Sequence, residues 1–170
     1  MSDPRILKFN TIAGKPPVSY EEGAEKFWES VSNQGKRVFE EAKEILEAIE
    51  NRDIGKLLDG WVDVWFTNEY LEDLLRAVQI NTVQAKNIVC ENNLSKFSTN
   101  ENYMKDCARL MEGVSVRKVE YEGTTYFALI RDSDGKVMKP LDYKEPKLHQ
   151  TIPASLWSYG KGGDVGCKEL

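Results

Sequence analysis

The stretch VFEEAKEILEAI, from Val38 to Ile49, is the most regular part of this sequence. Its apolar residues recur at intervals of one, three or four positions, which places them on one face of a helix. That face consists of Val38, Ala42, Ile45, Leu46 and Ile49. The stretch therefore predicts an amphipathic helix from Gly35 to Asn51 that packs against other helices.

The segment before this helix carries the signals of a helix start. Ser19 is followed by Glu21 and Glu22, whose negative charges suit the positive end of a helix dipole. We expect this short helix to end near Gly35. Residues 1–19 show no periodicity and contain the breaker run Gly-Lys-Pro-Pro, so they are expected to form a flexible, extended N-terminal arm.

The segments after the central stretch predict further helices. They cover residues 54–78, 81–92 and 99–112. Residues 57–66 are apolar almost all round, so we expect this half helix to be buried. The pattern predicts a mainly α fold with a four- or five-helix bundle over residues 20–112.

The remaining residues have sequence patterns typical of strands and loops. Two runs rich in β-branched and aromatic residues flank a Glu-Gly turn at 122–123, and a third short strand is expected after Asp134-Gly135. Residues 113–143 are therefore expected to form a small antiparallel β meander. Residues 144–170 have no usable period and are expected to be a C-terminal loop or strap.

Composition narrows the class of protein. The chain has 170 residues, of which 41% are hydrophobic and 30% charged, a balance that excludes disordered and fibrous classes. No apolar run is long enough to span a membrane, and the net charge of −5 argues against a nucleic-acid polymer as partner. The three cysteines form no C-x-x-C pair, and the first residues lack a signal-peptide pattern. We expect a cytoplasmic protein with ordinary thiols.

Acidic residues on two of the predicted helices are the clearest chemical signal. Glu40, Glu41 and Glu44 form an E-E-x-x-E cluster, in which Glu41 and Glu44 border the apolar stripe where a neighbouring helix would pack. Asp59 and Asp63 lie four residues apart on one face of an otherwise apolar segment. Such acids can form a solvated face or pair with Lys and Arg, but basic residues are fewer than acids in this region. A divalent cation is the more economical partner, and oxygen ligands favour Mg²⁺ or Mn²⁺.

The motifs together resemble a known family. They are Gln34, Val38, the E-E-x-x-E cluster at 40–44, the D-x-x-x-D pair at 59–63, N-N-L-S-K-F at 92–97 and D-G-K-V-M-K-P at 134–140. In this order they resemble the MazG-like all-α nucleoside triphosphate pyrophosphohydrolases, and most of all the bacteriophage branch described as phosphoribosyl-ATP pyrophosphohydrolase-like. The resemblance covers about residues 20–150.

The resemblance implies a set of roles for the acids. Glu41, Glu44 and Asp63 would bind Mg²⁺, and Glu40 would either bind the metal or orient the attacking water. Gly60 stands where the family has a glutamate, and Asp59, one residue earlier, is the substitute on the same helix.

The resemblance also implies substrate contacts. Asn93 would contact the base or sugar and Lys96 a phosphate, while Lys136 and Lys139 would belong to a phosphate-facing lid. Gln34 completes this set of substrate residues. By the residues alone, the polar end of a helix is the favoured interpretation of Asn93 and Lys96, and a simple hairpin loop is the alternative for the two lysines of the turn.

Three functional hypotheses follow. The first is a Mg²⁺-dependent nucleotide pyrophosphohydrolase that cleaves a nucleoside or deoxynucleoside triphosphate to the monophosphate and pyrophosphate. The second is a hydrolase of ppGpp or phosphoribosyl-ATP. The third is a binding module for a nucleotide or protein that keeps the bundle without turnover. The apolar face of Trp61, Trp65 and Phe66 additionally predicts a homo-oligomer, a dimer or tetramer.

Overall fold

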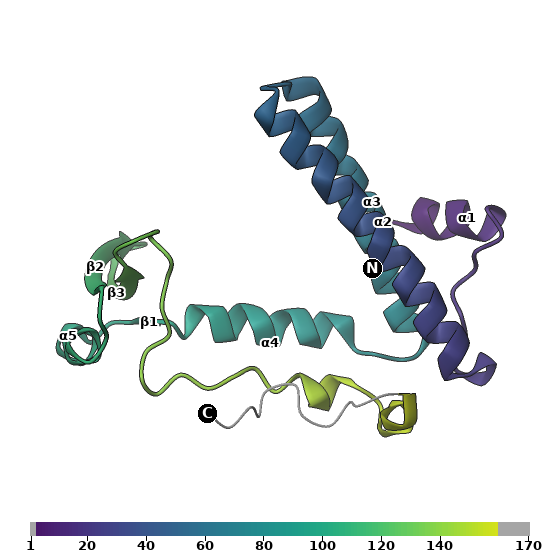
Figure 1. The fold of residues 1–170 in the computed structure, drawn as a ribbon. Coiled ribbons are helices and arrows are strands. Elements are labelled where there is room, and N and C mark those ends of the chain that lie inside the picture. Colours follow the sequence, from purple (N-terminus) through teal and green to yellow (C-terminus); the bar gives the residue numbers. More distant parts are fainter. Residues whose placement is uncertain (1–2, 160–170) are drawn as a thin grey trace. The chain divides into compact units, whose positions relative to one another are not determined.

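The computed structural model describes residues 3–159 and divides into two units. The first unit contains the chain up to Thr82 and the segment from His149, and the second contains Val83–Leu148. The fold is mainly helical with a small three-stranded antiparallel sheet, which confirms the predicted fold class (Figure 1). The boundary after Thr82 places the later helices of the predicted bundle, residues 20–112, in the second unit.

Two long antiparallel helices form the framework of the first unit (Figure 1). Helix α2 spans Ala24–Glu50 and helix α3 spans Ile54–Ala77. Between them, Arg52 adopts a left-handed φ of 53°, which helps to reverse the chain. Asp53 then begins α3, because its side chain accepts a hydrogen bond from the Lys56 backbone nitrogen at 3.0 Å.

Helix α2 is continuous, and the predicted helix end near Gly35 is wrong. A glycine in a helix costs about 1 kcal/mol relative to alanine. On either side of Gly35, however, α2 is held by tertiary contacts. Before Gly35, the buried Gln34 donates a hydrogen bond from Nε2 to the Thr67 carbonyl of α3 at 2.7 Å. After Gly35, Ile45 of α2 lies close to Gly60 of α3. Packing against α3 outweighs the local propensity of a single glycine.

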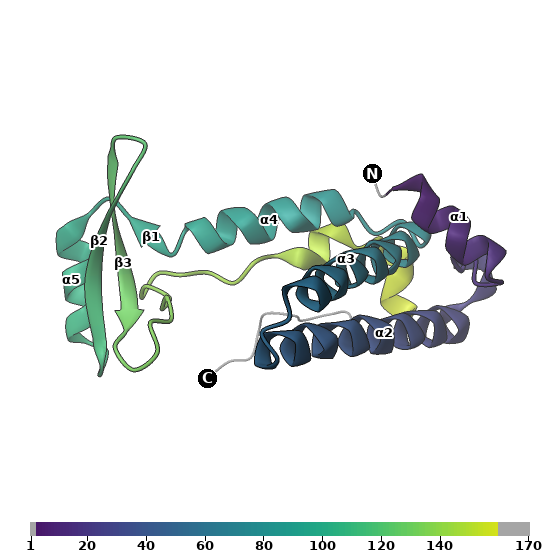
Figure 2. The same cartoon turned by 90° about the horizontal axis from the view of Figure 1, so that it is seen from above.

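The N-terminal segment is helical, which corrects the prediction of an extended arm. Helix α1 spans Pro4–Ile12, and the Asp3 side chain accepts a hydrogen bond from its first turn. Ile6 is fully buried and packs against Tyr70 and Leu74 of α3, so α1 lies beside α3 (Figure 2). The helix is formed because this apolar contact anchors a segment whose own periodicity is weak.

The core of the first unit is concentrated at one end of the α2–α3 hairpin. It joins α2 and the end of α3 to the 3-10 helix η3 (Ala154–Tyr159). Residues next to the 3-10 helices η1 (Tyr20–Glu22) and η2 (Leu148–Thr151) also contribute to it. The main buried cluster consists of Val18, Phe27, Val78 and Leu156. Part of the predicted C-terminal strap therefore packs on the first unit, while residues 160–170, including Cys167, lie outside the described residues.

The expected burial of residues 57–66, at the other end of the hairpin, is wrong. Trp61 is 60% exposed and Trp65 is 42% exposed. Within the described chain, α2 packs along α3, and Phe9 of α1 contacts Phe66 at the end of this half helix. The remaining apolar side chains of the half helix face solvent in a single copy of the protein.

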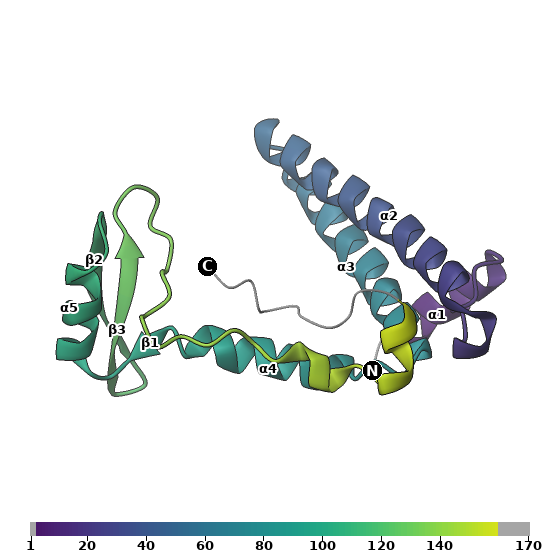
Figure 3. The same cartoon turned by 60° about the horizontal axis from the view of Figure 1, so that its bottom comes forward.

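The second unit combines two helices with the sheet. Helix α4 spans Thr82–Leu94 and helix α5 spans Glu101–Arg109. The sheet has the order β1-β3-β2, with β1 at Phe97–Ser98, β2 at Val114–Tyr121 and β3 at Thr124–Arg131 (Figure 3). Helix α5 packs on the sheet through Met104 and Cys107, which contact Phe127 and Leu129 of β3.

The third strand of the sheet differs from the prediction. It was expected after Asp134-Gly135, but it is β1, which precedes α5 and pairs with β3. Val137 of the expected strand makes an isolated bridge with Ile130. The two expected strands on either side of the turn at 122–123, β2 and β3, are confirmed. None of the helices in residues 3–159 is long and apolar enough to cross a lipid bilayer.

Candidate functional site

The α2–α3 hairpin brings the five predicted acidic residues into one electrostatic cluster. They are Glu40, Glu41 and Glu44 on α2 and Asp59 and Asp63 on α3. Partial burial is the main cause that raises the pKa of Glu41, and repulsion from Asp63 and then from the other three acids raises it further. The half-buried Glu41 is therefore the centre of the cluster, and Asp63 is its strongest charged neighbour.

Gly60 explains how the two acidic segments come so close. It is buried where α3 crosses α2, and a Cβ at this position would lie 3.2 Å from Ile45 Cγ1 and 3.4 Å from the Ile45 backbone nitrogen. A side chain there would press on α2 next to Glu44. The position where the resembled family has a glutamate is thus a helix contact in this chain. Asp63, one turn further on, is the acid of α3 whose charge raises the pKa of Glu41 most.

The donor chemistry of the cluster suits a hard divalent cation. All five donors are carboxylates, the ligand type that Mg²⁺ and Mn²⁺ prefer. A cation would also relieve the mutual repulsion that raises the pKa of Glu41. In residues 3–159, no three acidic, His or Cys side chains already converge in a metal-binding arrangement. The residue types fit the metal, and the side chains would need to turn toward it.

A cleft opens beside these carboxylates. Its volume is about 330 Å³, and its walls come from α1, α2 and α3. It is lined by Phe9, Asn10, Gln34, Arg37, Glu40, Glu41, Asp63, Phe66 and Thr67. The cleft therefore combines three of the predicted acids with a cation and two aromatic rings, which is enough polar and apolar surface for a small charged ligand.

Gln34 has a structural contact in addition to its place in the cleft. Its Nε2 donates to the Thr67 carbonyl, and the Thr67 hydroxyl donates to the Asp63 carbonyl at 2.8 Å. This chain of hydrogen bonds ties α2 to α3 one turn from the Asp63 carboxylate. The amide nitrogen of Gln34 is therefore already used in the contact between the two helices. Its predicted role in substrate binding stays a prediction.

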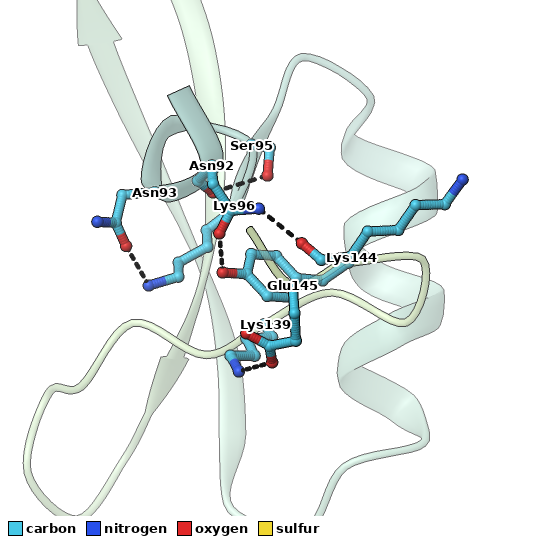
Figure 4. A network of polar contacts seen from close by, with 8 residues as sticks. Asn92, Asn93, Ser95, Lys96, Lys139, Lys144 and Glu145 are labelled. Atoms are coloured by element: carbon cyan, nitrogen blue, oxygen red, sulfur yellow. Dashed lines mark hydrogen bonds and ion pairs between the residues drawn. The ribbon is translucent and has the colours of Figure 1, made fainter. Parts of the chain in front are cut away.

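The other predicted substrate residues belong to the second unit. Lys96 Nζ donates a hydrogen bond to Asn93 Oδ1 at 2.6 Å, at the end of α4 (Figure 4). Lys139 forms an ion pair with Glu145. The Tyr143 ring lies near both cations, with its centroid 5.9 Å from Lys96 Nζ and 4.8 Å from Lys139 Nζ. Asn93, Lys96 and Lys139 therefore gather around one aromatic ring.

Lys136 has a different setting. It is exposed in the turn that leaves β3, and its backbone nitrogen donates to Asp134 Oδ1 at 3.1 Å. The same Asp134 carboxylate forms an ion pair with Arg131. These contacts make the turn a stable hairpin loop, and the predicted phosphate contact of Lys136 stays a prediction.

Two residues of the second unit were missed as candidates. The Tyr143 hydroxyl donates to Asn92 Oδ1, and Asn92 Nδ2 donates to the Lys144 carbonyl at 2.6 Å (Figure 4). Asn92 and Tyr143 thereby hold the segment that carries Lys139 against the end of α4. Asn92 lies in the quoted N-N-L-S-K-F motif, whereas nothing in the local sequence marks Tyr143.

The candidate residues thus form two groups, carboxylates in the first unit and an amide–lysine group in the second. In the first unit, Arg37 also lines the cleft and was missed as a candidate, because a single basic residue on an amphipathic helix carries no distinctive pattern. A comparison of this chain with protein-family models, curated proteins and solved structures finds no match.

Proposed function

We propose that the protein is a Mg²⁺-dependent nucleotide pyrophosphohydrolase, which cleaves a nucleoside or deoxynucleoside triphosphate to the monophosphate and pyrophosphate. The carboxylate cluster around Glu41 carries this proposal. Hydrolysis of a phosphoanhydride needs charge neutralisation and an oriented water more than it needs a protein nucleophile. A site built from carboxylates beside a cleft meets that need with neither His nor Cys in its lining.

In this proposal, Glu41, Glu44 and Asp63 hold the metal, with Asp59 as a further donor. When bound, Mg²⁺ would neutralise phosphate charge and act as a Lewis acid. Glu40 lines the cleft beside Glu41 and is the group that orients the attacking water and accepts its proton. Asn93, Lys96, Lys136 and Lys139 belong to the second unit, and we propose them as a nucleotide-contacting group of that unit.

A non-catalytic binding module is the second candidate, and the packing of Gly60 favours it. A Cβ at that position would lie 3.2 Å from Ile45 Cγ1, so Ile45 would have to shift to admit the acid that the resembled family uses. Fewer metal ligands reduce the charge neutralisation on which turnover depends. Tight nucleotide binding without formation of any product would support this candidate.

The decisive experiment is a turnover assay on a panel of nucleotides. The full chain is incubated with nucleoside and deoxynucleoside triphosphates, ppGpp and phosphoribosyl-ATP, with Mg²⁺ or with EDTA, and products are separated by chromatography. We expect a monophosphate and pyrophosphate from a triphosphate in Mg²⁺ only. Glu41→Gln and Asp63→Asn should each lower kcat by at least about 100-fold, because they remove ligand charge at nearly constant volume.

Glu47→Gln is the matched control. Glu47 is exposed on the same helix, and it is absent from the charges that act on Glu41. This variant should keep the activity of the unaltered protein. Near-normal turnover by Glu41→Gln and Asp63→Asn would show that the acids form a solvated face, and the proposal would then be wrong.

Two further parts of the proposal concern the oligomeric state of the protein and its location in the cell. We propose a homo-oligomer, a dimer or tetramer, because large apolar side chains of the α2–α3 hairpin are exposed in a single copy. We also propose a cytoplasmic location, where nucleoside triphosphates are present and where cysteines such as the exposed Cys90 stay reduced.

A further inference from the structure

A second cleft in the first unit adjoins the carboxylate cleft. Its volume is about 560 Å³. Gln34, Arg37 and Glu40 line both clefts, so the two meet at these side chains. Glu41 and Asp63 line the first cleft but not the second. A ligand that extends from the carboxylates past Arg37 would enter this second cleft.

The second cleft is rich in cations. Lys15, Lys26, Lys36 and Arg37 line it. Lys26 forms an ion pair with Glu22 at 3.4 Å. Among residues 3–159, the side chains of Lys15, Lys36 and Arg37 have no ion-pair or hydrogen-bond partner. Glu29 and Glu40 are the remaining acids of the lining. Three cations without partners at one cleft, in a chain of net charge −5, indicate an anionic ligand.

The N-terminal segment forms one wall of this cleft. Gly14, Lys15, Pro16 and Val18 belong to that wall, and Lys36 and Arg37 belong to the α2 wall. The Tyr70 hydroxyl of α3 donates to the Lys15 carbonyl, which holds the wall in place. Upstream, the Phe9 and Phe66 rings make an edge-to-face contact with centroids 5.4 Å apart. The backbone of Lys15 is therefore fixed by this hydrogen bond and by the packing upstream, and its exposed side chain extends from a fixed point.

We propose that the second cleft binds a polyphosphate chain, with Arg37 and Lys15 as the cations that contact the phosphates from the two walls. The identity of this ligand as the phosphates of a nucleotide rests on the proposed function. Arg37 suits the role, because a guanidinium group can bind phosphate oxygens in a bidentate way. The N-terminal segment, which lies outside the stretch that resembles pyrophosphohydrolases, then becomes part of the binding site.

The test uses inorganic tripolyphosphate and the full chain in EDTA at low ionic strength, measured by isothermal titration calorimetry. Without metal or nucleoside, binding reports the cations alone. Arg37→Gln should weaken tripolyphosphate binding by about tenfold or more, and Lys15→Gln should weaken it by about three- to tenfold. Lys8→Gln is the matched control, since Lys8 is exposed on α1 and lines neither cleft.

A second variant tests the positioning of Lys15. Tyr70→Phe removes the hydroxyl that holds the Lys15 carbonyl and leaves the lysine side chain in place. It should weaken tripolyphosphate binding nearly as much as Lys15→Gln. The double variant should then bind no more weakly than Lys15→Gln alone, because both changes act on the same contact. Full additivity of the two effects would show that Tyr70 does not position Lys15.

The outcomes separate this proposal from the proposed function. No binding of tripolyphosphate by the unaltered chain at millimolar concentration overturns the cleft proposal, as does an equal loss in Lys8→Gln and Arg37→Gln. Neither result bears on turnover in Mg²⁺. Conversely, tripolyphosphate binding that depends on Arg37 and Lys15 stands even if no nucleotide is hydrolysed.

Discussion

At the scale of single residues, Glu41 links the fold to the chemistry. Its pKa is raised above 4.5, first by burial and then by repulsion from Asp63 and the other acids. The folded protein therefore binds this proton more tightly than the unfolded chain does. Glu41 contributes stability below pH 4.5, and that contribution is lost as the pH rises through its folded pKa.

We therefore expect Glu41→Gln to stabilise the metal-free protein at pH 7. The glutamine has no charge to repel its neighbours, and relief of like-charge contacts should raise the melting temperature by about 1–3 °C. At pH 4, where Glu41 is largely protonated, the difference should vanish. Differential scanning fluorimetry in EDTA at both pH values measures this. A lower melting temperature at pH 7 would contradict the repulsive cluster.

In Mg²⁺ the order should reverse. The unaltered protein would gain stability by binding the cation, whereas Glu41→Gln would gain much less. Glu47→Gln again serves as the control and should respond to Mg²⁺ like the unaltered protein. An equal shift in all three proteins would show that Mg²⁺ acts elsewhere on the chain.

Lys96 and Asn93 allow a separate test of substrate recognition. Lys96→Ala should reduce kcat/KM by about tenfold or more, because it removes a cation expected to meet a phosphate. Asn93→Ala should instead change the preference among bases or sugars, since an amide both donates and accepts. Steady-state kinetics on several triphosphates measures both effects. Lys105→Ala, in an exposed ion pair with Glu101, is the control.

A helix-end role for the same pair makes a different prediction. If Lys96 and Asn93 only close the end of α4 through their 2.6 Å hydrogen bond, both variants should lower the melting temperature by similar amounts. In that case kcat/KM would be unchanged, and the nucleotide would be bound elsewhere.

At the scale of elements, two glycines of the α2–α3 hairpin have opposite surroundings. A Cβ at Gly35 would meet no atom within 4 Å, whereas a Cβ at Gly60 would lie 3.2 Å from Ile45 Cγ1. Gly35→Ala should therefore stabilise the protein by about 1 kcal/mol, which corresponds to a rise in melting temperature of about 2–4 °C. Gly60→Ala should gain less or be destabilising, because the helix contact must give way. Thermal melts of the two variants compare them directly, and an equal gain would contradict the close crossing at Gly60.

At the scale of the whole molecule, the exposed apolar stripes of the hairpin predict self-association. Leu58, Trp61 and Trp65 recur at the spacing of one face of α3, and all three are at least 42% exposed. Light scattering at micromolar concentration should give a mass of at least twice 19.4 kDa. Trp61→Lys should shift the protein toward the monomer, while Leu110→Lys, at an exposed position of the second unit, should not. A strict monomer would remove this prediction.

The sequence by itself determined the elements whose signals are local. The period of Val38–Ile49 predicts the part of α2 that follows Gly35, with its acidic border. Alternation and a Glu-Gly turn likewise predict β2 and β3. These patterns succeed because helical faces and tight turns depend on residues within a few positions of one another.

Tertiary structure alone decided the features that depend on distant partners. Helix α1 forms because Ile6 packs on Tyr70 and Leu74. Helix α2 continues through Gly35 because α3 contacts it before this residue, at Gln34, and after it, at Ile45. In the same way, β1 joins the sheet by pairing with β3 rather than through its own short sequence. The carboxylates were visible in the sequence, but the cleft that joins Arg37 to Lys15 was not, because its walls are contributed by segments that meet only after the chain has folded.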